Sequence, residues 1–396
     1  MLISQIQFNN KTCLATALVD TDIDRIIDLQ IAAKDKESLL GNIYVGKVSK
    51  IAPHINAAFI DIKPNFSCYY PLGKNKVFYA TSIPKRDTLK AGDELLVQVT
   101  AESLKEKIPT VTSHLNIASQ YAVLSYGKKG VGISAKLTDT EKLRLKELLA
   151  PYASKEYGIV ARTNAANAPD EAVLSDVQGL VARWDEVRHL GDTRTCYSLI
   201  DTAKPDYIQA LDGIKNDNLV EIITDDKDVF TYLQNYSHHS GVDYSEKLRF
   251  YDDKMLSLAK LYSLESTLDN ACKDKVWLKS GGFLVIQQTA AFVAIDVNSG
   301  KFQSKKEAAK TYQKINIEAA AEIAIQLRLR NLSGIILIDF INMKSEIDQE
   351  FLLETLQKQL RQDNMKAVVV DITPLGIVEA TRKKARKSLA EQIADI

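Results

Sequence analysis

The sequence lacks the features that mark secreted, disulfide-stapled and membrane-spanning proteins. It has only four cysteines, which are Cys13, Cys68, Cys196 and Cys272, and no CxxC pair among them. Because no signal-like segment opens the chain, we expect these residues to be free thiols in a reducing cytoplasm. No apolar run approaches the roughly 20 residues that a membrane helix requires. The sequence therefore predicts a cytoplasmic protein that does not bind a membrane.

The sequence also has no excess of charge of either sign. Lys plus Arg and Asp plus Glu each number 51 in a chain of 396 residues. A neutral total does not exclude nucleic-acid binding, because such binding depends on a local basic face. Hydrophobic residues make up 45% of the chain and charged residues 26%, as in globular proteins with substantial cores. A chain of this length can form two to four compact units.

The strongest pattern lies between residues 276 and 343. Two β-branched apolar runs each end in an aspartate, Asp296 and Asp339. Runs of this length bounded by Gly and Ser are typical of buried strands. Residues 305–332 between them have apolar positions at helical spacing and neither Pro nor Gly, so we expect a crossover helix. Such a β-α-β unit would place both acids at one edge of a sheet, where open α/β folds build their sites.

Two carboxylates at one sheet edge repel each other unless a cation lies between them. Mg²⁺ prefers oxygen ligands and keeps several waters, and it can activate a water and neutralise charge on a phosphate. Asn298 would point to the same side of the strand as Asp296 and could hydrogen-bond a carboxylate or a phosphate oxygen. The alternative is that these aspartates only cap the turns that follow the strands. Spacing alone does not decide between the two.

The first 113 residues are rich in predicted strands. Residues 1–32 alternate like three strands, with a hairpin turn at Asn9-Asn10, but they are too few to bury a core alone. Residues 41–113 form a run of short strands typical of a small barrel.

The predicted barrel is locally basic. Residues 41–107 contain ten Lys or Arg against six Asp or Glu, a net charge of +4. Aromatic residues are interleaved with these charges: Tyr44, Phe59, Phe66, Tyr69 and Tyr70. Stacking faces in a basic groove suit single-stranded RNA, whereas the alternative places the rings in the barrel core.

Residues 114–206 differ from the preceding segment because they mix predicted strands with two predicted helices, at 139–149 and 169–188. A capping box at Thr138 opens the first helix. Arg162 and Thr163 follow a strand that ends at Ala161 and precede a loop of small residues. An arginine beside a hydroxyl and free backbone N–H groups makes a phosphate pocket, and an exposed strand-end arginine is the alternative.

The remaining segments offer weaker candidates. His238-His239 has no further ligand at zinc-site spacing and is interpreted as solvated. A helix is predicted at 346–361 and a strand at 366–372. Asp371 in that strand is a weak candidate for a further metal ligand and is interpreted as a strand-end residue. We expect a last helix from Gly376. That helix would carry a basic run that either contacts an RNA backbone or is simply solvated, namely Arg382, Lys383, Lys384, Arg386 and Lys387.

Several of these segments resemble the ribonuclease E/G family of endoribonucleases. The similar segments, in chain order, are MLIS…ALVD, GNIYVGKVSKIAPHINAAFIDI, VWLKSGG, AIDVNSGKF, EIAIQLRLRNLSGIILIDFINM and LGIVEATRKKARKSL. The resemblance covers nearly the whole chain, and its motifs occur in the family's order.

The resemblance implies a multidomain α/β (α+β) fold. Its expected parts are a ribonuclease-H-like domain split between residues 1–38 and 207–275, an S1-type RNA-binding barrel at 39–113, a 5′-phosphate-sensor-like domain at 114–206, and a DNase I-like catalytic domain at 276–396.

The resemblance also implies roles for particular residues. Asp296 and Asp339 would hold one Mg²⁺ ion and Asn298 would complete the catalytic set. The RNA-binding positions of the barrel would be Phe59, Tyr69 in place of a phenylalanine, and Lys107.

A 5′-phosphate pocket is implied as well, and two positions in it depart from the family pattern. The pocket would use Val123, Arg162, Thr163 and Lys366. Ser119 replaces a usual glycine and would narrow the pocket. Lys366 replaces an arginine, which keeps the charge but loses bidentate geometry.

The resemblance predicts a Mg²⁺-dependent cut in single-stranded RNA that leaves 5′-phosphate and 3′-hydroxyl ends. The zinc-binding link and small tetramerising domain of larger members are not found here, so we expect no zinc and no zinc-linked tetramer. The sequence does not decide whether the chain forms a homodimer. The competing hypothesis is a non-catalytic RNA-binding or processing factor, and a weaker one is a phosphodiesterase acting on DNA.

Overall fold

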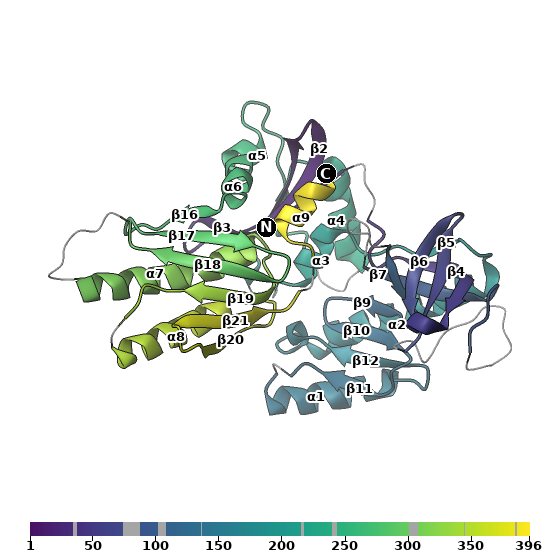
Figure 1. The fold of residues 1–396 in the computed structure, drawn as a ribbon. Coiled ribbons are helices and arrows are strands. Elements are labelled where there is room, and N and C mark those ends of the chain that lie inside the picture. Colours follow the sequence, from purple (N-terminus) through teal and green to yellow (C-terminus); the bar gives the residue numbers. More distant parts are fainter. Residues whose placement is uncertain are drawn as a thin grey trace. The chain divides into compact units, whose positions relative to one another are not determined.

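The computed structural model divides the chain into two units, which are described separately. Unit 1 comprises residues 1–36, 219–232 and 247–396, and unit 2 comprises residues 37–218 and 233–246. The structure describes residues 1–34, 38–73, 88–101, 108–135, 137–214, 218–239, 244–300, 308–343, 345–384 and 386–396. Both units mix helices with sheets, which confirms the predicted α/β class (Figure 1).

The first sheet of unit 1 joins the start of the chain to a segment beyond residue 220. Its strand order is β15-β14-β1-β2-β3. The strands are β1 (Leu2–Phe8), β2 (Lys11–Asp20), β3 (Arg25–Ala33), β14 (Ile222–Thr224) and β15 (Leu248–Phe250), and the helices that share their core are α5 (Leu258–Leu261), α6 (Leu264–Ala271) and α9 (Leu389–Asp395). α4 (Lys227–His239) begins in unit 1 and ends in unit 2. Asn9 and Asn10 both have positive φ, which confirms the predicted hairpin turn.

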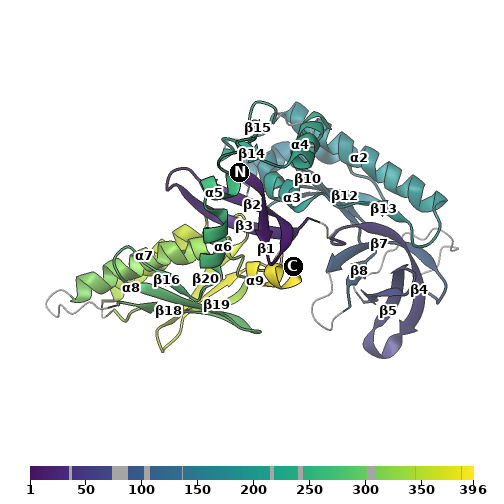
Figure 2. The same ribbon diagram turned by 90° about the horizontal axis from the view of Figure 1, so that it is seen from above.

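The second sheet of unit 1 contains the predicted β-α-β unit and has the order β16-β17-β18-β19-β21-β20. Its strands are β16 (Lys275–Trp277), β17 (Phe283–Gln288), β18 (Phe292–Asn298), β19 (Gly334–Asp339), β20 (Ala367–Ile372) and β21 (Ile377–Arg382). β18 and β19 are parallel, and α7 (Ala308–Leu329) connects them, as predicted. α7 and α8 (Glu346–Leu360) lie side by side on one face (Figures 1 and 2).

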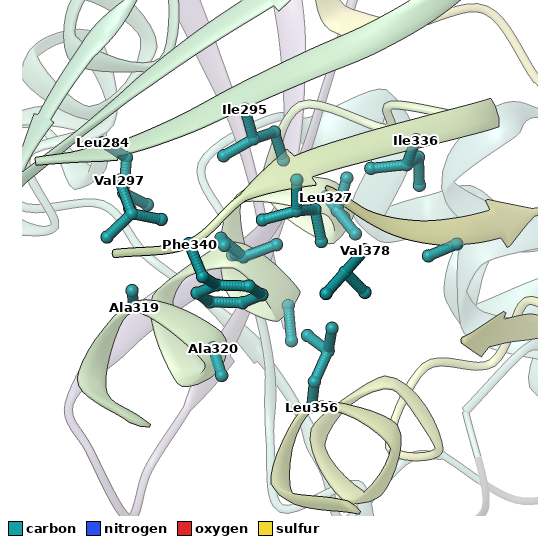
Figure 3. Packing of buried hydrophobic residues seen from close by; sticks show 14 of the residues in the cluster. Leu284, Ile295, Val297, Ala319, Ala320, Leu327, Ile336, Phe340, Leu356 and Val378 are labelled. Atoms are coloured by element: carbon teal, nitrogen blue, oxygen red, sulfur yellow. The ribbon is translucent and has the colours of Figure 1, made fainter. Parts of the chain in front are cut away.

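Alternating side chains separate the two faces of this sheet. Ile295 and Val297 point toward α7 and α8, where Ala319 and Ala320 let α7 approach closely (Figure 3). Asp296 between them is exposed. The face away from the helices also leaves Phe292 and Ile335 partly exposed. One face is therefore core, and the other, the open face, is accessible to a ligand.

The predicted last helix from Gly376 is wrong. Gly376 has φ of +85° in the turn between β20 and β21, and residues Ile377–Arg382 form strand β21. Val378 and Ala380 are buried at period two, which is strand spacing. The last helix, α9, begins only at Leu389, behind a capping box formed by Ser388 and Glu391.

Unit 2 contains a closed barrel in which the strand order β4-β5-β6-β8-β7 returns to β4. Its strands are β4 (Ile43–Ala52), β5 (Ala57–Lys63), β6 (Phe66–Pro71), β7 (Glu94–Ala101) and β8 (Thr110–Thr112), with η1 (Pro53–Ile55) after β4 and β13 (Leu199–Asp201) paired to β4. The five described strands confirm the S1-like barrel that the sequence predicts.

The remainder of unit 2 is a sheet with the order β11-β12-β10-β9 and its helices. These elements are β9 (Asn116–Ala118), β10 (Ala122–Tyr126), β11 (Val131–Ile133), β12 (Tyr157–Ala161), α1 (Asp139–Leu149), η2 (Ala150–Tyr152), η3 (Thr163–Ala165), α2 (Asp170–Thr193) and α3 (Asp206–Asp212). α1 opens with the predicted capping box of Thr138 and Glu141. In the described part of the chain, no helix has the length and apolar character needed to cross a membrane.

Candidate active site

Asp296 and Asp339 lie directly opposite each other on the open face. They are register partners in the parallel pair β18–β19, and both are exposed. Neighbouring strands are about 4.8 Å apart, so the two side chains leave the sheet within reach of a shared ion. No cation among the described residues pairs with either carboxylate. The structure therefore brings together the two acids that the sequence singles out.

Asn298 lies on the same side of β18 as Asp296. Its Nδ2 donates a hydrogen bond to Oδ2 of Asp296 at 2.7 Å. An amide donor on one carboxylate oxygen favours a single orientation of that carboxylate. The predicted orienting contact between these two side chains is thus present.

The chain beyond Asp339 is fixed by a buried asparagine of α7. Asn316 is 0% exposed; its Nδ2 donates to the carbonyl of Ile341 at 2.7 Å, and its Oδ1 accepts from the N–H of Ile341 at 3.1 Å. Phe340, the residue between Asp339 and Ile341, is also buried. These contacts hold both backbone groups of the turn after Asp339, so the direction of that carboxylate depends on α7.

The chain beyond Asn298 passes close to the turn between β16 and β17. A Cβ at Gly282 would lie 2.8 Å from the carbonyl oxygen of Asn298, and one at Gly300 would lie 2.4 Å from that of Gly281. The carboxylate of Glu318 in α7 accepts hydrogen bonds from the N–H groups of Lys279 and Ser280 in the same turn. Close backbone approach therefore requires glycine at 282 and 300, whereas Gly281 meets no neighbour and is favoured by its φ of +89°.

The donor set suits a hard divalent cation that keeps most of its waters. Among the described residues, no group of three or more His, Cys, Asp or Glu side chains could hold an ion. The site instead offers two adjacent carboxylates and the amide of Asn298. Mg²⁺ is commonly bound through one or two carboxylates, with water and phosphate oxygens completing the octahedron. The residues present fit that ion.

Two further groups on the open face are not predicted as site residues. The first consists of Lys275, Trp277 and Phe283, in the two strands on one side of Asp296. The second is Glu379, which pairs across strands with Leu337 and with Asp371 and lies one row from Asp339. The sequence could have predicted the first group, because the alternation K-V-W in β16 places Lys275 and Trp277 on one face of the strand. Glu379 is missed because its segment is predicted as helix.

Phe59 and Tyr69 form an aromatic pair on the described part of the barrel surface. Phe59 and Tyr69 are register partners on β5 and β6, and their rings pack edge to face with centroids 6.5 Å apart. Both are half-buried, whereas Tyr44 and Tyr70 belong to the barrel core. The two predicted stacking residues are therefore adjacent. Lys107 lies outside the described residues.

The predicted 5′-phosphate residues of unit 2 gather at the ends of β10 and β12. Arg162 donates to the carbonyl of Ser119, and the hydroxyl of Thr163 lies 3.1 Å from that of Ser134. Val123 is half-buried on β10 and pairs with Val160. Lys366 precedes β20 in unit 1.

Ser119 does not point its hydroxyl into free space. Its Oγ donates to the carboxylate of Asp176, which also accepts from the N–H of Tyr121 at 3.0 Å. Burial raises the pKa of Asp176, and these two hydrogen bonds oppose the shift. Ser119 therefore takes part in a hydrogen-bond network around Asp176, which a glycine at this position could not join through a side chain.

The basic run expected on the last helix has a structural role at its ends. Arg382 is 3% exposed and its Nε donates to Asp363 at 2.6 Å. Arg386 pairs with Asp28 of β3, and Lys387 pairs with Asp395. None of the three residues lies on a helix, so the predicted solvated helix face is wrong for them, and Arg382 is too deeply buried to contact an RNA backbone. The side chains of His238 and His239 lie outside the described residues.

Comparison with known proteins agrees with this architecture. Residues 116–385 match the model of the ribonuclease E/G family. The chain is 31% identical to ribonuclease G of Salmonella typhimurium over 96% of its own length and 80% of that protein, and 32% identical to ribonuclease G of Haemophilus influenzae over 96% and 79%. It is 32% identical to ribonuclease E of Nostoc over 94% of its own length and 55% of that protein. The chain belongs to the ribonuclease E/G family.

Proposed function

We propose that this chain is an endoribonuclease that cuts single-stranded RNA at the Asp296–Asp339 pair. One observation carries the proposal: two carboxylates are paired in register on the open face, without an internal cation among the described residues. Membership of the ribonuclease E/G family, with relatives named ribonuclease G and ribonuclease E, supports the same reaction class.

In the proposed reaction, Asp296 and Asp339 would hold Mg²⁺, and Asn298 would keep Asp296 in its binding orientation. When bound, the ion would lower the pKa of a water and neutralise charge on the phosphate. Water oxygen would bond to phosphorus while the bond from phosphorus to O3′ breaks. The products would carry a 5′-phosphate and, after O3′ takes up a proton, a 3′-hydroxyl.

The carboxylates alone would repel an RNA backbone, so the substrate needs attraction from other residues. The barrel sequence has a net charge of +4 between residues 41 and 107. Phe59 and Tyr69 present neighbouring rings on which unpaired bases can stack. We infer that the barrel captures the single strand on which the catalytic pair acts.

The decisive experiment compares three aspartates of the same sheet. Purified protein is incubated with a fluorescent single-stranded oligoribonucleotide, with Mg²⁺ or with EDTA. Asp296→Asn and Asp339→Asn should each reduce cleavage by at least about 10³-fold, because the ion supplies several kcal/mol of transition-state stabilisation. Asp371→Asn is the matched control, since Asp371 is an exposed acid on the open face and is not a register partner of the pair.

Three outcomes of this experiment would contradict the proposal. Undiminished cleavage by either variant would remove that aspartate from the site. RNA that is retarded in a gel but never shortened would identify a non-catalytic binding factor. Equal cleavage of the DNA version of the oligomer would identify a less selective phosphodiesterase.

We also propose that Val123, Arg162 and Thr163 of unit 2 recognise the 5′ end of the substrate, and that the positive charge of Lys366 in unit 1 adds to the attraction for RNA. Because Arg162 already donates to the carbonyl of Ser119, a bound phosphate would compete with that internal contact. Comparing 5′-monophosphate with 5′-hydroxyl versions of one oligomer tests this recognition. Equal rates for the two would show that the 5′ end is not sensed.

A further inference from the structure

An aromatic cluster lies on the open face beside the catalytic pair. We name it the aromatic platform, and it consists of Lys275, Trp277 and Phe283. The rings of Trp277 and Phe283 pack edge to face with centroids 5.3 Å apart. The Lys275 Nζ lies 4.0 Å from the Trp277 centroid and 3.7 Å from that of Phe283. These contacts hold the indole in a fixed orientation.

The platform exposes a large apolar surface that the fold does not use. Trp277 is 64% exposed, whereas Trp184, the other tryptophan of the chain, is 0% exposed and stacks on Tyr126. Among the described residues, Lys275 has no carboxylate partner. An ordered, exposed indole beside an unpaired cation has the composition of a single-strand binding surface.

The strand register connects the platform to the catalytic pair. Lys275, Val285, Asp296 and Asp339 form one row of register partners across β16, β17, β18 and β19. Trp277, Phe283 and Asn298 form the next row. Two strand spacings, about 10 Å, separate the backbone of Trp277 from that of Asn298. A nucleotide next to the one held at the catalytic pair can therefore reach the indole of Trp277.

We propose that the aromatic platform stacks an unpaired base of the RNA strand next to the scissile phosphate, with Lys275 facing a neighbouring backbone phosphate. This inference rests on the proposed function and adds a substrate subsite to it. The site would require at least one unpaired base beside the cut, because a base within a duplex cannot present its face to the indole. The positive charge of Lys275 would offset repulsion between RNA and the two aspartates.

The tryptophan content of the chain allows a direct binding measurement. Fluorescence is titrated in Asp339→Asn protein, so that the RNA stays intact, with a single-stranded oligoribonucleotide. Stacking on Trp277 should quench the emission of the exposed indole and leave that of buried Trp184 unchanged. Replacing Trp277 by Phe in the same background should abolish the quenching. Equal quenching with and without Trp277, or none in either protein, would overturn the platform.

Kinetics in otherwise unchanged protein provide the second measurement. Trp277→Ala should raise KM about 5- to 100-fold, the loss expected for one stacked base, and leave kcat near the wild-type value. Trp277→Phe should recover part of the loss. Phe351→Ala is the control, because Phe351 is 52% exposed but lies on α8, which covers the other face. Lys275→Gln should lower the salt slope of log KM by about 0.7, as for one lost phosphate contact.

Abasic substrates identify the contacted position. A single abasic nucleotide is moved stepwise through the positions that flank the cut. At the stacked position, wild type and Trp277→Ala should have the same KM, since the base that distinguishes them is missing. A constant ratio between the two proteins at every position would contradict base stacking and indicate instead that Trp277 contacts something else, such as a second copy of the chain.

Failure of the platform and failure of the nuclease proposal give different results. If wild-type protein cleaves RNA while Trp277→Ala has normal KM and the quenching is absent, only the platform is refuted. If no RNA is cleaved, the nuclease proposal fails, and the titration still decides whether Trp277 binds a base.

Discussion

Unit 1 holds aspartates in two opposite settings. Asp363 is 7% exposed and accepts hydrogen bonds from the buried guanidinium of Arg382, which also donates to Asn331. Asp296 and Asp339 are exposed, adjacent and without a cation among the described residues. A carboxylate with an internal partner stabilises the fold, whereas a like-charged pair facing solvent costs stability and needs a ligand. The same residue type thus serves structure at one place and chemistry at another.

The largest effect on stability is expected at the buried pair. Asp363→Ala should lower the free energy of unfolding by about 3–5 kcal/mol, because it leaves the charge of Arg382 buried without its partner. Chemical denaturation followed by circular dichroism measures the change. Lys383→Met is the matched control, since Lys383 is the exposed neighbour of Arg382 and should change stability by less than about 0.5 kcal/mol. A loss as small as the control's would mean that the pair does not stabilise unit 1.

A smaller effect is expected at the asparagine that links α7 to the active site. Asn316→Ala should lower the free energy of unfolding by about 1–3 kcal/mol, because the N–H and C=O of Ile341 lose their partners. If Asn316 positions Asp339, kcat should fall while KM for RNA stays near wild type. Gln349→Ala, which removes one hydrogen bond to the Met343 carbonyl further along the same loop, serves as control. Loss of stability with unchanged kcat would reduce Asn316 to a purely structural role.

The smallest effect on stability is expected at the catalytic pair itself. Without divalent ions, Asp339→Asn should be within about 0.5 kcal/mol of wild type or more stable, because it removes a repulsion between exposed charges. Adding Mg²⁺ should raise the melting temperature of wild type and not that of the variant, since only a bound ligand stabilises the folded state. A variant clearly less stable than wild type in EDTA would place Asp339 in the same class as Asp363.

The sequence predicts much of unit 1 because its signals are periodic. Two β-branched runs and an uninterrupted helical segment identify β18, α7 and β19, and the side-chain alternation then puts Asp296 and Asn298 on one face. The error at Gly376 has a physical cause as well. Residues 377–388 contain charges at several spacings, and the burial of Arg382 depends on Asp363 and Asn331, which are distant in sequence. Tertiary partners of this kind are invisible to local periodicity.

Long-range contacts also explain why the sequence predicts the candidate sites of unit 2 only in part. Residue types leave open whether Arg162 and Thr163 form a phosphate pocket or an exposed strand end, and they do not reveal that Ser119 is bonded to Asp176. In the barrel, the alternation along β5 and β6 distinguishes the outward side chains of Phe59 and Tyr69 from the inward side chain of Tyr70. The pairing of β4 with β7 that closes the barrel joins distant segments, so local alternation does not predict it. Sequence therefore predicts which groups are available, and the fold decides which of them are already used.

The split of the first sheet has a consequence for how the chain is made. β1 must find β14 across more than 200 intervening residues, and Ile31 of β3 donates its N–H to the side chain of Gln392. During synthesis, β1, β2 and β3 therefore leave the ribosome well before β14 and Gln392, which complete their pairing. Gln392, the partner of Ile31, follows 361 residues later in the chain. A chain whose synthesis halts before residue 222 would leave the edge of β1 that pairs with β14 without its partner, and an unpaired strand edge favours aggregation.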